Sequence, residues 1–244
     1  MPKGLYARYL VLLPHADDEL IGCDQLLKSD AYCLVVNMDM RGNDSDKLHQ
    51  IRYGELQSYV NSINRELITV SQDKVEGLSR IISEYKPDVI CIPSCFDWHP
   101  EHFLVMQYLR ESLLKNTVTP LIAMYQVSVP LLSDYINMAL PMNKSEYDEK
   151  WNGFSCYYKS QKHLPVFRFG ANERVNGKLL KTFAAESYIV LDNKRWCSII
   201  NKALNIEMGA VLRPHVNNLI NIRKHLFPLY DMILNQNGNN VMKN

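Results

Sequence analysis

Two short clusters of histidines and acidic residues contain the side chains that could do chemistry in this chain. The candidates are, in the first cluster, His15, Asp17 and Asp18 and, in the second, His99 and His102. Zinc accepts a mixture of imidazole and carboxylate ligands, and a catalytic zinc site needs only three protein ligands. The two clusters therefore predict one divalent-metal site with an acid or base left over.

The spacing within each cluster suggests different roles for its members. His15 and Asp18 lie three residues apart where a turn enters a helix, so they can converge on one ion. Asp17 lies between them and must point elsewhere, where it could take a proton from a water that the metal activates. His99 and His102 are also three residues apart at a helix start, so their rings share a face. One can bind the metal while the other stabilises an oxyanion or protonates a leaving amine.

Each cluster alone also has a structural explanation. An acidic run at a helix N-terminus can simply complement the helix dipole, and most His-x-x-His pairs are surface residues. However, both clusters follow an apolar run of strand length, Tyr9–Leu13 and Val89–Pro93. This places both at the carboxyl ends of buried strands, where open α/β sheets bind their ligands. The coincidence favours a functional site.

Strand-like and helix-like segments alternate through the first half of the chain. The expected strands are Tyr9–Leu13, Tyr32–Asn37, Leu67–Val70, Val89–Pro93 and Leu121–Val129. The expected helices are Glu19–Lys28, Ser45–Ile63, Asp73–Tyr85 and Pro100–Lys115. Continuous apolar strands separated by helices indicate a parallel sheet covered on both faces. We therefore predict an α/β, Rossmann-like fold with a mostly parallel sheet.

The second half is less regular. We expect a helix over Lys144–Gln161, capped through Ser145 and Asp148, and a strand within Ala185–Leu191. Two helices should follow over Trp196–Ile206 and His215–Leu234, the latter interrupted at Pro228. No domain boundary is visible, so we predict one domain over 1–244, with a helical C-terminal extension from about residue 195 and a frayed tail over 235–244. The last helix could bind a membrane surface or a second copy of the chain, or pack on its own domain.

Composition excludes several classes of protein. The chain has 244 residues, of which 47% are hydrophobic, and a net charge of +1, which fits a globular protein without a nucleic-acid partner. Its first apolar stretch is too short for a signal peptide, and no run approaches the ~20 apolar residues of a transmembrane helix. Six scattered cysteines without a CxxC pair favour reduced thiols. We expect a cytoplasmic protein with no transmembrane segment, and assembly into a homo-oligomer stays open.

Five ordered motifs make the chain similar to a known family. It resembles the PIG-L or LmbE-like N-acetylglucosaminyl deacetylases, which include the GlcNAc-phosphatidylinositol de-N-acetylases. The motifs are Pro14-His-Ala-Asp-Asp-Glu19, Arg52-Tyr-Gly-Glu55, His99-Pro-Glu-His102, Tyr158-Lys-Ser-Gln161 and Ala185-Glu-Ser-Tyr188. The resemblance spans roughly residues 8–191. Ala16 replaces the customary proline and Glu101 the customary aspartate, and neither change removes a group to which the family gives a catalytic role.

The resemblance implies a role for each residue of the two clusters. His15, Asp18 and His102 would hold a zinc ion, or another divalent metal. Asp17 would be the general base that activates the metal-bound water. His99 would act as the electrostatic or acid partner at the tetrahedral intermediate.

Three further side chains are candidates for substrate binding. Arg52 would, by the resemblance, face the substrate near its acetyl group or sugar, and the alternative is an ion pair with Glu55 in its own helix. Arg41 could reach a sugar hydroxyl or phosphate from the loop after the second strand, although a solvated loop is the simpler interpretation. Trp98 could stack on a pyranose ring or merely pack. The remaining histidines have no partner at ligand spacing and are expected to be structural or exposed; they are His49, His163, His215 and His225.

The activity that the resemblance implies is removal of an N-acetyl group from an amino sugar, with release of acetate. The partner would be a GlcNAc-type glycoconjugate or sugar nucleotide, and the setting glycan biosynthesis. Two alternatives remain open. A metal-dependent hydrolase of another amide or ester would use the same residues, and a non-catalytic sugar-binding subunit would keep them for structure.

Overall fold

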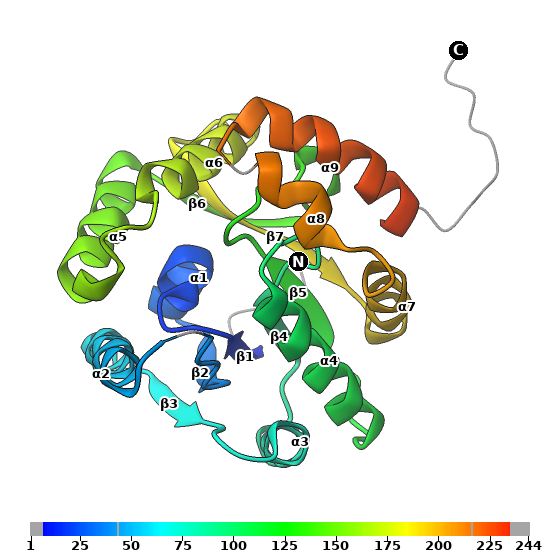
Figure 1. Cartoon of the computed structure of the whole chain (residues 1–244). Coiled ribbons are helices and arrows are strands. Elements are labelled where there is room, and N and C mark those ends of the chain that lie inside the picture. Colours follow the sequence, from blue (N-terminus) through cyan, green and yellow to red (C-terminus); the bar gives the residue numbers. More distant parts are fainter. Residues whose placement is uncertain (1–6, 43, 216, 235–244) are drawn as a thin grey trace.

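Seven strands form one mixed sheet in the computed structural model, which describes residues 7–42, 44–215 and 217–234 (Figure 1). The strand order is β3-β2-β1-β4-β5-β7-β6. The parallel strands are β1 (Arg8–Leu13), β2 (Tyr32–Asn37), β3 (Glu66–Thr69), β4 (Val89–Pro93) and β5 (Leu121–Tyr125). At one edge, β7 (Ala184–Leu191) runs antiparallel to both β5 and β6 (Met138–Met142). The prediction of a mostly parallel α/β sheet is confirmed.

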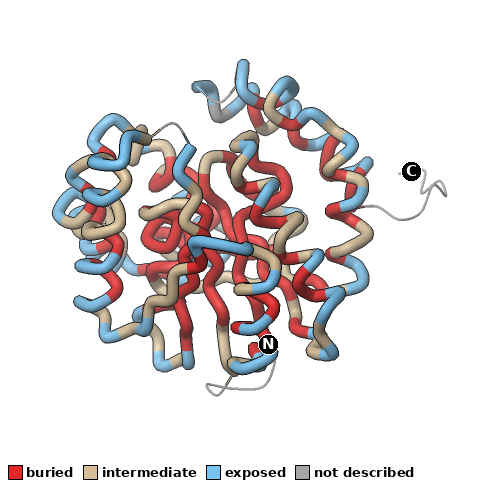
Figure 2. Tube along the Cα trace, turned by 60° about the horizontal axis from the view of Figure 1, so that its bottom comes forward, coloured by how far each residue is buried: buried red, intermediate tan, exposed pale blue. Residues whose placement is uncertain are grey.

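Helices cover both faces of the sheet. One face packs against α1 (Asp18–Lys28), α2 (Asp46–Ser62), α5 (Lys144–Tyr157) and α6 (Val166–Leu179). The other packs against α3 (Lys74–Tyr85), α4 (Pro100–Leu114), α7 (Asn193–Ala203), α8 (Met208–Leu212) and α9 (Leu219–Leu234). Along β1, Leu10 and Leu12 belong to the hydrophobic core on the face covered by α3 and α4, while Val11 and Leu13 belong to the core on the face covered by α1 and α2. Successive side chains of a strand point to opposite faces, so a strand buried on both sides must be apolar throughout. Figure 2 shows the strands as a buried centre within a more exposed shell.

The order of the strands explains why the two clusters meet. β1 and β4 are neighbours in the middle of the sheet, although β2 and β3 lie between them in sequence. The His15–Asp18 segment follows the end of β1, and the Asp97–His102 segment follows the end of β4. Parallel neighbours end at the same edge, so the fold delivers both segments to one place.

The second half of the chain differs from the sequence-based expectation at several points. Strand β6 and helix α6 were not predicted. The helix expected over Lys144–Gln161 ends at Tyr157 and is followed by a separate 3-10 turn, Lys159–Gln161. Its cap is Asn143, which forms a capping box with Glu146, rather than Ser145 with Asp148. Two candidate capping sequences so close together cannot be ranked without the backbone that enters the helix.

Two further expectations about secondary structure need correction. Strand β5 stops at Tyr125 rather than continuing to Val129, because the segment after it turns into the site. Pro228 does not interrupt the last helix, and α9 runs through it. A proline removes one backbone hydrogen bond and favours a bend, but here the buried side chains on either side, Leu226 and Leu229, anchor the helix to the core. The tail over 235–244 lies outside the described residues.

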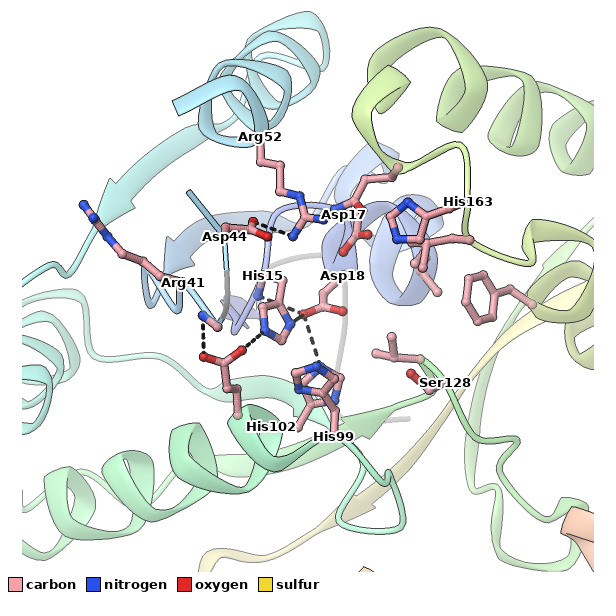
Figure 3. Close-up of a pocket in the computed structure, with 17 residues that line it drawn as sticks. His15, Asp17, Asp18, Arg41, Asp44, Arg52, His99, His102, Ser128 and His163 are labelled. Atoms are coloured by element: carbon pink, nitrogen blue, oxygen red, sulfur yellow. Dashed lines mark hydrogen bonds and ion pairs between the residues drawn. The ribbon is translucent and has the colours of Figure 1, made fainter. Parts of the chain in front are cut away.

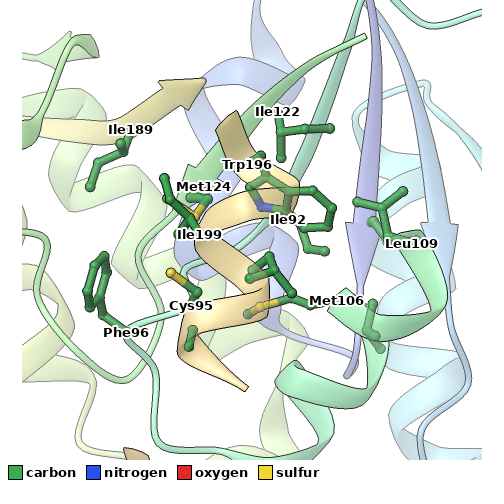
Figure 4. Close-up of a cluster of buried hydrophobic side chains, with 14 of the residues drawn as sticks. Ile92, Cys95, Phe96, Met106, Leu109, Ile122, Met124, Ile189, Trp196 and Ile199 are labelled. Carbon is green, nitrogen blue, oxygen red and sulfur yellow. The ribbon is translucent and has the colours of Figure 1, made fainter. Parts of the chain in front are cut away.

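The C-terminal helices share the core of the sheet. Trp196 from α7 is fully buried, and Figure 4 shows its ring beside Ile92 and Ile122 of the central strands. Tyr230 of α9 stacks on Phe96, with 3.6 Å between the ring centroids. Of the residues that the structure describes, no helix has both the length and the apolar character needed to cross a bilayer.

Candidate metal and catalytic site

A polar pocket of about 230 Å³ lies where the segments after β1, β2, β4 and β5 converge. Its lining includes the five residues of the two sequence clusters, His15, Asp17, Asp18, His99 and His102. Figure 3 shows the imidazoles of the second cluster pointing toward His15 and Asp18. The tertiary structure thus brings together two clusters that lie far apart in the sequence.

Three imidazoles and one carboxylate are close enough to share an ion. The nearest ligand nitrogens of His15, His99 and His102 all lie within 4.8 Å of one another. Asp18 Oδ2 lies 3.5 Å from His15 Nδ1 and 3.6 Å from His102 Nε2. His15 and His102 therefore form a compact set of three candidate ligands with either His99 or Asp18.

The surroundings of His102 fit a metal ligand. Its Nε2 faces Asp18, while its Nδ1 lies 3.5 Å from Oδ2 of Asp97 on the other side. Metal-bound histidines usually direct their second ring nitrogen at a carboxylate, which fixes the ring and its tautomer. Asp97 is itself fixed, because it accepts the backbone N–H groups of Trp98 and His99 at 2.7 and 3.0 Å. The nitrogen and oxygen donors of this pocket suit zinc.

Asp17 occupies a strained position beside these candidate ligands. Its φ of 123° is a conformation that non-glycine residues rarely adopt, and its backbone N–H is donated to Glu19 Oε2 at 3.2 Å. Strain of this kind persists where the surrounding structure over-determines it, often at active sites. The carboxyl is buried, so desolvation raises its pKa well above the usual range, and the charge of Asp18 raises it further. Such a carboxyl group is suited to accept a proton.

The pKa values of His15 and His99 are shifted in opposite directions. Burial lowers the pKa of His15, but hydrogen bonds to Asp18 and Glu101 outweigh this and raise it to about 10. Burial lowers the pKa of His99 to about 4, and the neighbouring His102 and His15 add to the effect. A metal must therefore displace a proton from His15, which makes its binding pH-dependent.

Glu101 connects His15 to the loop after β2. Its Oε2 lies 2.7 Å from His15 Nε2, and its Oε1 accepts the backbone N–H of Gly42 at 2.8 Å. Gly42 has a φ of +53°, which a glycine adopts without strain. The residue that departs from the family motif thus closes one side of the pocket.

Arg52 and Glu55 of the second motif do not pair with each other. Arg52 Nη1 lies 2.6 Å from Asp44 Oδ2, and both residues line the pocket. Glu55 instead accepts the Ser160 backbone N–H at 2.9 Å and the Ser160 hydroxyl at 2.5 Å. The alternative of an ion pair within α2 is therefore wrong. The helix presents Arg52 to the pocket and uses Glu55 to hold the fourth motif.

The fourth motif is attached directly to the first. The Tyr158 hydroxyl donates to Glu19 Oε1, and Gln161 Nε2 donates to the Ala16 carbonyl at 3.2 Å. Burial raises the pKa of Glu19 to about 8, although the bond from Tyr158 lowers it. The Tyr158–Gln161 motif thereby braces the turn that holds Asp17.

The other two substrate-binding candidates lie in different places. Arg41 lines the pocket, but its exposed guanidinium also forms an ion pair with Asp46, with 2.9 Å between Nη1 and Oδ1. Trp98 lies outside the pocket, in a neighbouring hollow beside Arg213. Trp98 therefore does not face the pocket, and the hypothesis that it stacks on a pyranose ring stays a prediction.

Several pocket residues were not singled out in the sequence. His163, expected to be structural or exposed, is an exposed side chain that also lines the pocket, just after Gln161 of the fourth motif. Asp44 comes from the loop after β2. The ends of the predicted strands were the available signal, because loops at that edge must surround the site.

Solved structures of deacetylases share this fold. The chain matches N,N'-diacetylchitobiose deacetylase from Pyrococcus horikoshii with a TM-score of 0.59 and 17% identity, over 76% of this chain and 84% of that chain. It matches the zinc-inhibited form of teicoplanin deacetylase Orf2 with a TM-score of 0.56 and 12% identity, over 76% of this chain and 98% of that one. A conserved protein from Thermus thermophilus gives a TM-score of 0.59 and 15% identity, over 75% of this chain and 94% of that one. No family model and no curated protein matches the sequence.

Proposed function

We propose that this chain, which has the fold of the solved deacetylases, is a PIG-L/LmbE-like, zinc-dependent hydrolase that removes an N-acetyl group from an amino sugar. The observation that carries the proposal is the convergence of His15, Asp18 and His102 beside the buried carboxyl group of Asp17. Two of the structural neighbours are deacetylases, which supports the reaction class. The five motifs support the family.

His15, Asp18 and His102 would hold the metal, and His99 would remain free. When bound, a zinc ion would polarise the amide carbonyl and make water more acidic. Asp17 would remove a proton from the water whose oxygen attacks the amide carbon. His99 would donate a hydrogen bond to the carbonyl oxygen as negative charge develops there. As the carbon–nitrogen bond breaks, Asp17 would pass its proton to the amine, giving acetate and a free amino sugar.

The rest of the pocket would orient the substrate. Arg52 is fixed by Asp44, so its position is set before a ligand arrives. Arg41 and His163 lie on the exposed side of the pocket, where sugar hydroxyls would approach. A space of about 230 Å³ is comparable to one N-acetylated sugar ring, so a larger substrate would extend beyond it.

The first test is acetate release from N-acetylated amino sugars, sugar nucleotides and glycosides by metal-stripped protein with and without added zinc. We expect Asp17→Asn to lower the rate about 100-fold or more, as is typical for removal of a general base. The matched control is Asp134→Asn, which makes the same change on the exposed 3-10 turn Ser133–Tyr135, away from the pocket.

The outcomes separate the alternatives. Zinc-dependent acetate release that Asp17→Asn abolishes would support the deacetylase. Zinc bound at one ion per chain without acetate release would favour hydrolysis of another amide or an ester. A protein that binds no metal and releases no acetate would contradict the enzyme and favour a sugar-binding subunit.

A further inference from the structure

A second hollow adjoins the polar pocket and is built mainly from apolar side chains. It encloses about 550 Å³ between α4 and the segment 204–213, which contains α8. Its apolar lining includes Trp98, Phe103, Leu204, Ile206, Met208 and Ala210. We call it the Trp98 groove. Part of its wall lies beyond residue 191, where the family motifs end.

The groove begins where the candidate catalytic residues end. Trp98 immediately precedes His99, and the centroids of their rings are 5.6 Å apart. Helix α8 packs directly on this segment, since a Cβ atom at Gly209 would lie only 3.4 Å from the Trp98 carbonyl oxygen. The two residues that flank His99 in the chain, Trp98 and Pro100, thus both line the groove.

The sizes of the two spaces indicate what each can hold. Ligand pockets usually enclose roughly 300–1,000 Å³, so the polar pocket, at about 230 Å³, is small and the groove falls within the range. The reacting acetamido group must lie at the polar pocket. The remainder of a glycoside then needs another surface, and the groove begins at the residues that flank His99.

The charges of the groove favour a neutral occupant. One exposed acid, Glu207, and one exposed base, Arg213, belong to its lining. The Arg213 guanidinium lies 5.5 Å from the centroid of the Trp98 ring and so already has a partner. An apolar surface with balanced charge stabilises a bound uncharged apolar group more than it stabilises a bound phosphate.

We propose that the Trp98 groove binds an apolar aglycone of the amino-sugar substrate, such as an alkyl or aryl group on the anomeric oxygen. This inference rests on the proposed function and names the class of substrate for the same site. The groove acts as a specificity site, with Trp98 as the surface that the aglycone covers. Arg213 would border the bound group without pairing with it.

Binding of two product glycosides tests the groove without turnover. Methyl and hexyl glucosaminide carry the free amine and differ only in the aglycone, and calorimetry on the zinc-loaded protein measures both. Each methylene group that the groove buries adds to the affinity of the ligand. We therefore expect the hexyl compound to bind about tenfold tighter or more, even if only part of the chain is buried.

Two neighbouring positions of α8 supply the variant and its control. Ala210 lines the groove and is exposed, so Ala210→Trp should fill the groove without disturbing the core. Val211 is exposed on the same helix and does not belong to the groove lining, so Val211→Trp makes a similar change elsewhere. Ala210→Trp should remove the hexyl advantage, and Val211→Trp should keep it.

Equal or undetectable binding of the two glycosides by the unmodified protein would overturn the proposal, as would a hexyl advantage that survives Ala210→Trp. Acetate release from methyl N-acetylglucosaminide, measured in parallel, tests the proposed function separately. Acetate release without tighter binding of the hexyl compound would contradict aglycone binding in the groove but would still support the deacetylase. A hexyl advantage that Ala210→Trp removes, without acetate release from any substrate, would support the groove and reject the deacetylase.

Discussion

At the scale of single residues, the site depends on side chains that hold other side chains in place. Asp97 is buried and accepts three backbone N–H groups, from Trp98, His99 and Ser128, while its Oδ2 faces His102. It contacts a candidate ligand without lining the pocket. We therefore assign it as a positioning residue for His102.

Replacing Asp97 by asparagine should weaken zinc binding about 10- to 100-fold, as is usual when the outer partner of a metal-bound histidine is changed. The amide oxygen can still accept the backbone N–H groups of Trp98 and His99, but the charge that orients the imidazole is lost and an NH2 group replaces the oxygen that faces Ser128 and His102. A competition titration with a zinc chelator measures the effect. Glu111→Gln, on the surface of α4, is the control. Unchanged affinity in Asp97→Asn would show that this carboxylate does not support the metal site.

At the scale of elements, a buried ion cluster joins the helices around α1 to strand β7 of the sheet. Lys150 of α5 is fully buried and lies 2.5 Å from Glu173 of α6 and 3.2 Å from Glu186 of β7. Glu186 also accepts the backbone N–H groups of Gln25 and Leu26 in α1. The fifth family motif, which contains Glu186, thus supports the helix that carries Asp18 rather than contacting the pocket.

Lys150→Ala should destabilise the protein by about 3–5 kcal/mol, because it leaves two buried carboxylates without their cation. Chemical denaturation monitored by circular dichroism measures the change. Lys144→Ala, on the exposed first turn of the same helix, removes a surface ion pair with Asp148 and should change stability by less than about 1 kcal/mol. Similar effects of the two substitutions would contradict a structural role for the buried cluster.

The same cluster predicts a pH dependence. Burial raises the pKa of Glu173 from 4.5 to about 7, although Lys150 opposes the shift. The folded protein therefore binds this proton more tightly than the unfolded chain, and the associated stability is complete below pH 4.5 and is lost as the pH rises through about 7. Glu173→Gln cannot titrate. The stability of this variant relative to the parent protein should therefore increase as the pH rises through this range. Thermal unfolding at several pH values measures the difference in stability, and a difference that does not change with pH would show that the pKa of Glu173 is not raised.

At the scale of the whole molecule, the C-terminal helices belong to the main hydrophobic core. Trp196 is fully buried among residues of β4 and β5, and Tyr230 packs on Phe96 in the segment that leads to the site. We propose on this basis that residues 1–244 act as one domain. Helix α8 then serves both the core, through Met208 and Leu212, and the groove beside the site.

Trp196→Ala should lower stability by about 3–5 kcal/mol, the usual cost of removing a large buried side chain. If the chain is one domain, unfolding should remain a single transition that fluorescence and circular dichroism report together. Phe227→Ala, half exposed on α9, should have a much smaller effect. A two-step transition, with the first step alone shifted by Trp196→Ala, would assign the C-terminal helices to a separate unit.

The first half of the fold could be predicted from sequence because its signals are local. Strands buried on both faces must be continuously apolar, and Leu10–Leu13 and Val89–Ile92 satisfy this wherever they lie in space. Strand β6, Met138-Ala-Leu-Pro-Met142, was missed because it is a short edge strand that contains a proline. Helix α6 has only a weak apolar face, since several of its buried side chains are polar.

The candidate site was likewise predictable from the sequence only in part. The sequence determined which residue types follow the strand ends, and therefore that His15, Asp18 and one of His99 and His102 could reach one ion. Only the tertiary structure decided that Arg52 pairs with Asp44, that Glu55 holds Ser160 and that Trp98 faces a groove closed by α8. Which of these partners a side chain meets depends on how the helices and loops pack on the sheet, a choice that no local pattern encodes.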